Sequence, residues 1–386
     1  MVTAKKPQGA VPKLRFPGFE GEWDQVVLGN VLTLQYGASL AADSRQTGDV
    51  PVIGSNGIVG YHDTPLISGP AIVVGRKGSA GSVTWIDADC FPIDTTFYVE
   101  VNDRNEYKLS FLKLVLDNRK LDRLVDRGGV PGLSRGVVYS EYAAIPRPAE
   151  QQKIADCLSS LDACIGAETR KLDALKAHKQ SLMQQLFPAE GQRLPRLRFP
   201  GFKGDWEIKE VGDIFSVTRG EVLSMTLVSD EKTPDTLYPV YSSQTKKNGL
   251  AGYYSAYLYE NAITWTTDGA NAGDVNYRAG KFYCTNVCGV LINNDGYANP
   301  CLAALIGSVA KKHVSYVGNP KLMNGVMAKI NIPIPSFEEQ QKIVGCLSSF
   351  DRLIDVQFQK ICMLQQHKKG LMQGLFPATH CPTTED

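Results

Sequence analysis

Residues 151–188, QQKIADCLSSLDACIGAETRKLDALKAHKQSLMQQLFP, decide the fold, because they recur at 340–377 as QQKIVGCLSSFDRLIDVQFQKICMLQQHKKGLMQGLFP. In each copy apolar residues return at alternating steps of four and three, which is typical of a coiled-coil seam, here sustained over about five heptads. Polar residues interrupt the seam at matching places, Glu168 with Gln357 and Lys179 with Lys368. We expect the two helices to pair through Leu158, Leu161, Ile165, Leu172, Leu175 and Leu182 in the first copy, and Leu347, Phe350, Ile354, Ile361, Leu364 and Leu371 in the second.

The duplication extends beyond these helices. Residues 12–23, PKLRFPGFEGEW, recur at 195–206 as PRLRFPGFKGDW, in the same order and at nearly the same spacing. The chain is therefore a tandem repeat of a unit of ~185 residues. Residues 38–140 and 221–325 resemble each other only faintly, which indicates a shared fold whose surface has diverged.

Both diverged regions contain short β-branched or aromatic runs separated by Gly, Pro and Asp, a pattern that predicts strands. We expect strands at 71–75, 82–86 and 97–101, then at 262–265 and 289–292, and a helix over 107–125. The fold class is α+β, with two mixed α/β strand-rich domains joined by two long antiparallel coiled-coil helices in a pseudo-twofold tandem repeat. The antiparallel direction follows from connectivity, because a compact domain tends to have its termini close together. The alternative is that each helix covers a core separately.

Proline sets the expected boundaries, because the residue before a proline avoids the helical conformation. Pro146 and Pro148 precede the first helix, and Pro333 and Pro335 precede the second. We expect one domain over 1–148 and another over 189–335. The helices then span 149–188 and 336–378, and a tail covers 379–386.

Composition narrows the class of protein. The chain has 386 residues, 43% hydrophobic and 21% charged, with a net charge of +1, which fits a globular protein and excludes a strongly basic one. Nine cysteines, an odd number, and an opening MVTAKKPQGA without an apolar segment favour a reducing, cytoplasmic location. No apolar run approaches the ~20 residues of a membrane helix.

Motifs that would supply chemistry are not found. Residues 279–282, AGKF, fail the phosphate-loop pattern at both ends, and no Asn-Pro-Pro-aromatic tetrapeptide of amino-methyltransferases occurs. Cys284 and Cys288 form the only close cysteine pair, for which buried thiols are favoured over a zinc site. Gly18 and Gly21 are better explained by a turn than by a nucleotide loop. We therefore expect no catalytic residue, no metal and no cofactor in this chain.

Flexible loops with Arg, Lys, Asn and Ser recur in both diverged regions, and these side chains suit phosphates and base edges. The same chemistry would also suit carbohydrate or protein partners, and an ordinary solvated loop is the plainer interpretation of any one of them. The candidate DNA-binding residues are Ser55, Asn56, Arg76, Lys77, Arg127 and Arg135 in the first region, and Ser242, Gln244, Lys246, Lys247, Thr267, Asn271, Lys321 and Asn324 in the second.

The repeated ends resemble the specificity subunits of bacterial type I restriction-modification systems. The resemblance lies in the L-R-F-P-G-F-x-G-x-W openings followed by Leu28-Gly29 and Val211-Gly212, the I-P-x-P…E-Q-Q-K-I helix starts and the Leu-Met-Gln-x-Leu-Phe-Pro helix ends. It implies two target recognition domains, each contacting one half of a split, asymmetric double-stranded DNA site. It also implies spacer helices that dock two methyltransferase subunits, which bind S-adenosylmethionine, with motor-nuclease subunits added in the full complex.

The resemblance implies a non-catalytic reader of DNA. A net charge near zero is low for such a reader, so either its basic groups are clustered or the methyltransferase subunits contribute to DNA binding. A competing class is a protein-binding scaffold, in which the coil recruits partners and the two domains bind protein or sugar. A fused methyltransferase or endonuclease is a third possibility, and it would require the catalytic motifs that the sequence lacks.

Overall fold

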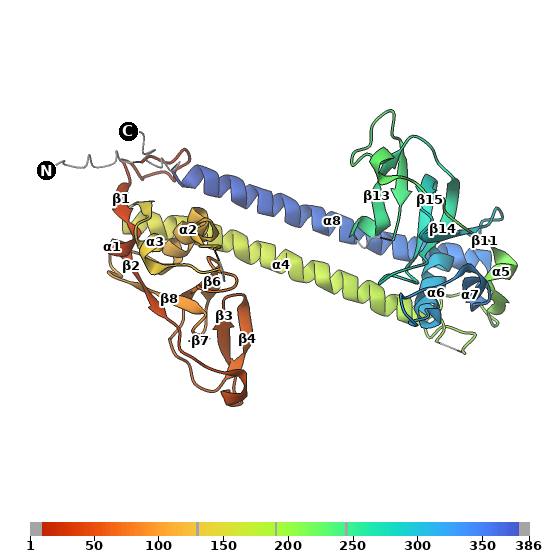
Figure 1. Cartoon of the computed structure of the whole chain (residues 1–386), viewed down its shortest axis with the longest axis horizontal. Helices are drawn as coiled ribbons and strands as arrows, with labels where there is room; N and C mark the ends of the chain where they lie inside the picture. The colour runs from red at the N-terminus through yellow and green to blue at the C-terminus, as the bar shows by residue number, and fades with distance from the viewer. Residues whose placement is uncertain (1–9, 129–130, 190, 244–245, 378–386) are drawn as a thin grey trace. The chain divides into compact units, whose positions relative to one another are not determined.

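The structure, a computed structural model, describes residues 10–128, 131–189, 191–243 and 246–377 (Figure 1). The chain divides into two compact units, Met1–Thr169 with Gln359–Asp386, and Arg170–Phe358. Each unit contains one strand-rich domain, the beginning of the long helix that follows that domain, and the end of the other long helix. The first unit is therefore discontinuous in sequence and the second is continuous.

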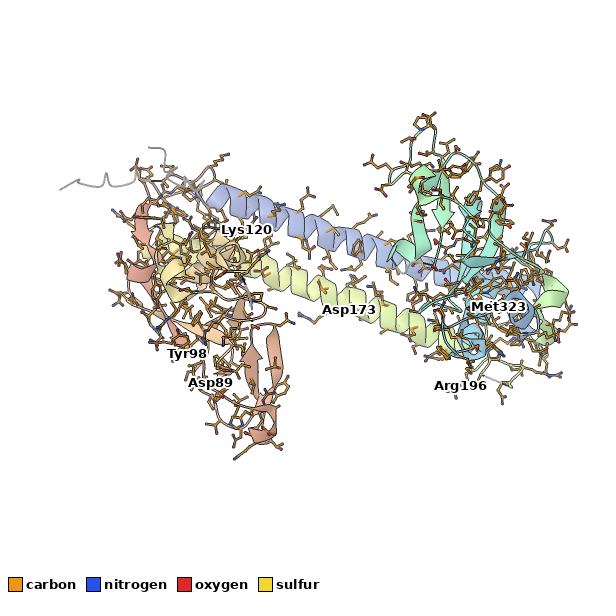
Figure 2. All side chains as sticks on the ribbon, viewed as in Figure 1. Asp89, Tyr98, Lys120, Asp173, Arg196 and Met323 are labelled. Carbon is orange, nitrogen blue, oxygen red and sulfur yellow. The ribbon has the colours of Figure 1, made fainter. Side chains whose placement is uncertain are left out.

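The repeated segments form two uninterrupted helices, α4 (Pro148–Leu186) and α8 (Phe337–Leu375). Every predicted seam residue is buried or half-buried, whereas positions between them, such as Asp173, are exposed (Figure 2). The buried seam residues are Leu158 and Leu172 on α4, and Leu347 and Ile361 on α8, and the others are half-buried. The apolar stripe is thus covered in both copies.

Ion pairs fix the direction of the helices within each unit. In the first unit, Lys368 of α8 donates to both carboxylate oxygens of Asp162 on α4, at 2.6 and 2.8 Å. In the second unit, Lys179 of α4 donates to Asp351 of α8 at 2.5 Å. The beginning of each helix thus pairs with the end of the other, which confirms the predicted antiparallel arrangement.

The two conserved sequence motifs meet at the start of each long helix. Glu150, the third residue of α4, accepts two hydrogen bonds of 2.8 Å from Arg15. Glu339 of α8 accepts the same pair from Arg198, also at 2.8 Å. Each arginine also donates to carbonyl oxygens of the P-G-F-x-G turn, in which Gly18 adopts a φ of +88°. The openings are conserved between copies because they hold the helix starts.

A buried glutamine completes each helix start. Gln151 donates to the carbonyl oxygens of Pro146 and Glu106 at 2.8 and 2.9 Å, and its own oxygen accepts from the backbone of Lys108. Gln340 donates to the carbonyl oxygen of Pro335 and accepts from Asn299. The E-Q-Q part of the motif is therefore a structural joint between helix and domain.

Among the described residues, the strands of the first unit form three sheets. β1 (Asp24–Val27) pairs with β9 (Tyr142–Ile145), and two larger sheets have the orders β2-β8-β5-β6 and β4-β3-β7. Their strands are β2 (Leu32–Tyr36), β3 (Val50–Gly54), β4 (Gly57–His62), β5 (Ala71–Gly75), β6 (Val83–Ile86), β7 (Phe91–Pro92) and β8 (Thr96–Val101). The helices are α1 (Leu28–Val31), α2 (Leu109–Arg119) and α3 (Arg135–Tyr139), with 3-10 turns η1 (Ala42–Ser44) and η2 (Leu121–Leu124).

The second unit joins the corresponding strands into one larger sheet. β10 (Glu207–Glu210) pairs with β17 (Asn331–Ile334), and the main sheet has the order β11-β16-β14-β15-β12-β13. Its strands are β11 (Ser216–Arg219), β12 (Tyr238–Tyr241), β13 (Leu250–Tyr254), β14 (Tyr259–Thr266), β15 (Val275–Cys284) and β16 (Cys288–Ile292). The helices are α5 (Val211–Ile214), α6 (Pro300–Ala310) and α7 (Asn324–Ala328), with 3-10 turns η3 (Met225–Leu227), η4 (Lys246–Gly249) and η5 (Lys311–His313).

The difference between the sheets has a local cause. β15 is ten residues long and reaches β12, whereas its counterpart in the first unit is broken into β6 and β7 by residues 87–90. The helix predicted over 107–125 is likewise shorter, since Lys120 takes a left-handed φ of +50° and ends α2. The predicted strands coincide with β5, β6, β8, β14 and β16, and the predicted α+β class is confirmed.

Each unit has its own core, to which the ends of the long helices contribute. Phe376, directly after α8, stacks on Phe111 at a ring-centroid distance of 5.6 Å, and Trp23 meets both rings edge-on. Leu186 and Phe187 belong, together with Trp206, to the second core. Within the described ranges, no helix is both long enough and apolar enough to cross a membrane.

Candidate nucleic-acid interface

Three predicted loops of the first unit are joined by hydrogen bonds. The Ser82 hydroxyl donates to the carbonyl oxygen of Ser55 at 2.6 Å, which ties the loop after β5 to the turn after β3. The backbone of Leu133 donates to the carbonyl oxygen of Arg76 at 2.9 Å, and Gly78 donates to Pro131 at 3.3 Å. Segments around residues 55, 76 and 132 therefore form one continuous surface.

Two of the predicted arginines share one tyrosine ring on this surface. The Cζ atom of Arg76 lies 4.8 Å from the ring centroid of Tyr36, and that of Arg135 lies 4.4 Å away. Arg76 also donates through Nη1 to the carbonyl oxygen of Asp94 at 3.0 Å. Arg135 donates through Nη1 to the carbonyl oxygen of Leu34 at 3.2 Å. The fold thus holds two cationic groups in fixed positions.

The other candidates of the first unit lie around this pair with fewer restraints. The side chains of Asn56, Lys77 and Arg127 are exposed, and Ser55 is half-buried. The backbone of Lys77 forms a bridge with Gly132, which places the lysine beside Arg76 at the loop edge. Exposed cations of this kind suit contacts with phosphates.

The second unit repeats the backbone arrangement of these loops. The backbone of Leu322 donates to the carbonyl oxygen of Thr267, as Leu133 does to Arg76. Gly269 donates to Pro320, as Gly78 does to Pro131, and the side chain of Asn271 donates to Ser243 at 2.9 Å. These bonds make Thr267 the counterpart of Arg76, Asp268 that of Lys77, and Asn324 that of Arg135.

The side chains at these positions have different chemistry in the second unit. Thr267 is 1% exposed, and its hydroxyl donates to Val287 and Asp268. Its side chain therefore stabilises the loop from inside and is not presented at the surface. Lys321 is exposed, with its Nζ 3.9 Å from a carboxylate oxygen of Asp268. Asn271 and Asn324 are half-buried. This surface offers amides, hydroxyls and a partly neutralised lysine.

The remaining candidates of the second unit are placed less fully. Ser242 accepts a hydrogen bond from the Thr285 hydroxyl at 3.1 Å. Lys246 and Lys247 begin η4, and Gln244 lies outside the described residues.

Two functional candidates were not predicted. Tyr36 lacks any sequence signal, because it ends a strand roughly a hundred residues before Arg135. Arg278 of β15 is 8% exposed, stacks over Tyr241 at 3.8 Å and donates to the Thr264 hydroxyl at 3.0 Å. Burial lowers the pKa of Arg278. A charged residue within a strand was the one available sequence signal for Arg278, which places a buried cation against Tyr241 at the end of β12.

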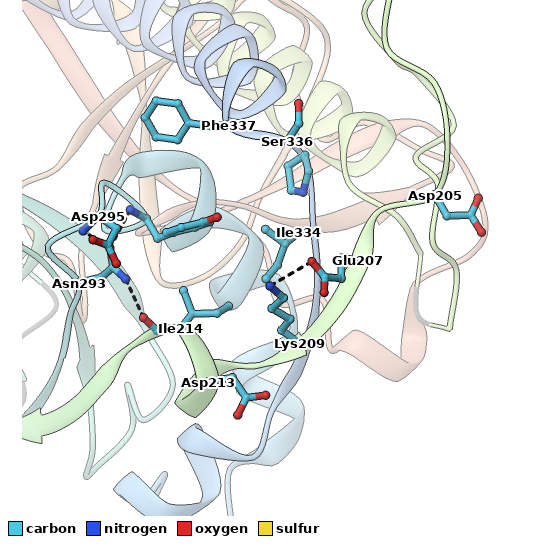
Figure 3. Close-up of a pocket in the computed structure, with 12 residues that line it drawn as sticks. Asp205, Glu207, Lys209, Asp213, Ile214, Asn293, Asp295, Ile334, Ser336 and Phe337 are labelled. Carbon is cyan, nitrogen blue, oxygen red and sulfur yellow. Dashed lines mark hydrogen bonds and ion pairs between the residues drawn. The ribbon is translucent and has the colours of Figure 1, made fainter.

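A pocket of about 370 Å³ in the second unit has a different character (Figure 3). Its carboxylates come from Asp205, Glu207, Asp213 and Asp295, and its lysine, Lys209, is paired with Glu207 at 3.0 Å. None of the predicted DNA-binding residues lines it. An acidic lining repels phosphates, so this pocket is not part of the candidate interface.

The close cysteine pair of the second unit belongs to the interior. Cys284 and Cys288 are buried, and a hydrogen bond with Cys288 together with burial raises the pKa of Cys284. In the portion of the chain that the structure describes, no three His, Cys, Asp or Glu side chains are grouped so as to hold a metal ion.

Comparison with known proteins identifies relatives of both repeats. The chain matches the type I restriction modification DNA specificity domain family over residues 20–177 and 203–366. It is 40% identical over 144 residues to a Mycoplasma pneumoniae protein named as the N-terminus of a type I specificity subunit, covering 36% of this chain and 75% of that protein. It is 34% identical over 151 residues to the type I restriction enzyme MpnII specificity subunit of the same species, covering 38% of this chain and 44% of that subunit.

A solved structure has the same fold. The S subunit of a type I restriction-modification system from M. genitalium superposes with a TM-score of 0.69, over 96% of this chain and 100% of that one. The two sequences are 18% identical. Conservation of the fold at this identity agrees with a structural frame that tolerates extensive surface change.

Proposed function

The chain belongs to the family of type I restriction modification DNA specificity proteins, and on that premise we propose that each of its two domains reads one half of a bipartite, asymmetric double-stranded DNA site. The chain acts as the reader of the complex and carries out no chemistry itself.

The loop surface that occurs in both domains with different side chains carries this proposal. Backbone bonds put Arg76 and Thr267 at equivalent positions, and likewise Arg135 and Asn324. A shared backbone gives both domains the same approach to a DNA duplex. Base recognition depends on which donors and acceptors are presented in the groove, so different side chains specify different half-sites.

The partners follow from the internal repeat. Two equivalent helix starts, one built on Arg15 and Glu150 and the other on Arg198 and Glu339, offer two equivalent frames to a second protein. We propose that two methyltransferase subunits dock on the conserved helices, and that they, rather than this chain, bind S-adenosylmethionine. Motor-nuclease subunits complete the assembly, which acts in the cytoplasm. The chain spans under half of the MpnII subunit, so these partners are inferred from the family.

The net charge of +1 is compatible with this role because the cations are grouped. Arg76, Lys77 and Arg135 lie on one surface of the first domain, while carboxylates gather in the pocket around Asp205. The methyltransferase subunits would add their own contacts with phosphates.

Methylome sequencing tests the proposal. The chain is expressed with its methyltransferase subunit in a host without other adenine methylation, and methylated adenines are mapped. We expect one motif with two unlike halves separated by a fixed gap. A single uninterrupted motif, or no motif in a host where the complex assembles, would contradict the proposal. Omitting the specificity chain is the control, and methylation should then disappear.

A gel-shift competition separates DNA reading from the scaffold function. The assembled complex should retain a duplex that carries the mapped motif against an excess of random duplex. Equal competition by both duplexes would favour a scaffold that binds DNA only through charge.

A further inference from the structure

Tyr36 is an exposed aromatic residue of the first domain that contacts two arginines. Its side chain is 48% exposed at the end of β2, and its ring packs against Phe97 at 5.2 Å. Arg76 and Arg135 both lie within cation–π distance of the ring, and Arg76 also lies 6.0 Å from Phe97. Contacts with two guanidinium groups and with Phe97 restrain the exposed ring of Tyr36.

Among the described residues, the positive charges of the two guanidinium groups are not neutralised by a neighbouring carboxylate. Within the part of the chain that the structure describes, neither forms an ion pair, and each donates only through Nη1, to a backbone carbonyl. The Nε and Nη2 groups of each arginine therefore keep their donors. Two like charges so close to one ring favour an electron-rich ligand between or above them.

The fixed geometry favours a base edge over a phosphate. An arginine reads guanine by donating two parallel hydrogen bonds to O6 and N7, which requires a correctly oriented guanidinium plane. The carbonyl oxygen of Asp94 restrains one end of the Arg76 guanidinium, and that of Leu34 restrains one end of the Arg135 guanidinium. The ring of Tyr36 contacts both groups. A contact with a phosphate needs no such orientation of the cation. The exposed Lys77, which follows Arg76 in the chain, can supply the phosphate contact.

We propose that Arg76 and Arg135 read guanine in the first half-site, and that Tyr36 is the positioning residue that orients both guanidinium groups for it. This inference rests on the proposed DNA-reading function and adds the base that one domain recognises.

The second domain cannot read its half-site in this way. Gly37 donates to Thr96 as Gly220 donates to Cys288, which makes Arg219 the counterpart of Tyr36. The positions of Arg76 and Arg135 are occupied by Thr267 and Asn324. Guanine reading through a shared aromatic ring is therefore confined to one half-site.

The test uses the assembled complex and duplexes that carry the mapped motif. In each duplex one guanine of one half-site is replaced by 7-deazaguanine, which lacks the N7 acceptor. We expect at least one replacement in one half-site to weaken binding by about 5- to 140-fold. The same replacement should have no effect on the double variant Arg76→Ala/Arg135→Ala, because the readers of N7 are absent.

Variants of the ring isolate the positioning role. Tyr36→Leu should reduce the preference for guanine over 7-deazaguanine by about twofold to fivefold for each arginine, because the cation–π contact is lost. Tyr36→Phe retains the ring and should retain the preference. Tyr142→Leu is the matched control, since Tyr142 is similarly exposed but lies in the two-stranded sheet of the frame.

The outcomes are distinguishable. If no 7-deazaguanine replacement weakens binding, or if Arg76→Ala/Arg135→Ala weakens random duplex as much as the motif, guanine reading is wrong and the arginines bind phosphates. If Tyr36→Leu leaves the guanine preference unchanged, the positioning role is wrong. If no bipartite motif exists, the proposed function itself fails, which is a separate result of the methylome experiment.

Discussion

Lys179 on α4 pairs with Asp351 on α8, and the residues that occupy the equivalent places in the repeat, Lys368 and Asp162, pair in the same way with the helices exchanged. Each helix therefore contributes one acid and one base at corresponding positions. A parallel arrangement could not satisfy both pairs. The two lysines that interrupt the apolar seam thus specify the direction and register of the helices.

Exchanging the charges of one pair should test this role. Asp162→Lys should lower the free energy of unfolding by roughly 1 kcal/mol, because it places two cations together on a partly exposed surface. Adding Lys368→Asp should restore most of that loss. Thermal unfolding of the two single variants and of the double variant measures the coupling between the two side chains. If the loss of stability in the double variant equals the sum of the two single losses, the pair contributes nothing.

Removing one heptad from both helices should change the gap between half-sites. Deleting residues 168–174 and 357–363 keeps both lysine–aspartate pairs, because each deletion lies between them in its helix. Each helix shortens by ~10 Å at 1.5 Å per residue, which corresponds to about three base pairs. Methylome sequencing should therefore show a shorter gap, and deleting the heptad from α4 alone, which breaks the register, is the control. An unchanged gap would refute the spacer role.

The buried carboxylate at the start of α8 should be sensitive to loss of its partner. Arg198→Ala leaves Glu339, whose side chain is 2% exposed, without its bidentate partner, and should cost about 3 kcal/mol of unfolding free energy. The hydrogen bond with Glu339 raises the pKa of Arg198, so the guanidinium stays charged across the usual pH range. Arg196→Ala, at an exposed position of the same segment, should change stability by under ~0.5 kcal/mol. Denaturant unfolding compares the two, and similar values would contradict the structural role of the pair.

Lys77→Ala should weaken the binding of every duplex by the same factor. An exposed lysine that contacts a phosphate releases about one counterion, so the slope of log binding constant against log salt should fall by about 1. Lys13→Ala, at an exposed position of the N-terminal segment, serves as the control and should leave the slope unchanged. A loss confined to the mapped motif would instead make Lys77 a base-reading residue.

Thiol labelling should follow the placement of the cysteines. Burial raises the pKa of Cys90 to about 11 and that of Cys301 to about 12, so neither forms the reactive thiolate at pH ~8. Cys164 and Cys362 are exposed on the long helices and should react first. In a Cys381→Ser background, which removes the cysteine outside the described residues, mass spectrometry after brief alkylation should find those two labelled. Cys90 and Cys301 should stay unlabelled until denaturant is added, and early labelling of Cys301 would contradict its position in the second core.

The parts of the fold that could be predicted are those that repeat or have a period. The heptad seam identified the helix positions that are buried, because burial of a helix face imposes a spacing that is visible in the sequence. The strands at 71–75 and 289–292 could be located for a similar reason, since buried strands are continuous apolar runs. The single six-stranded sheet of the second domain could not, because it depends on whether β15 continues through one short segment.

Only part of the candidate interface could be predicted from the sequence. Arg76 and Arg135 stood out as cations in glycine-containing loops, but nothing in the sequence brings Tyr36 into contact with them. That contact depends on the pairing of β2 with β8, which is a tertiary relationship. Thr267 shows the opposite difficulty, since a hydroxyl in a polar loop gives no sign that it is turned inward.

The position of Phe376 in the first core has a consequence for biosynthesis. A ribosome has made every residue of the second unit once it passes Phe358, but the first unit still lacks Phe376, which stacks on Phe111. The portion of the chain that emerges earliest is therefore the last to acquire its complete interior. A nascent chain that stops before α8 ends would therefore carry an N-terminal domain whose core is incomplete. Proteases should cleave such a truncated chain within that N-terminal domain.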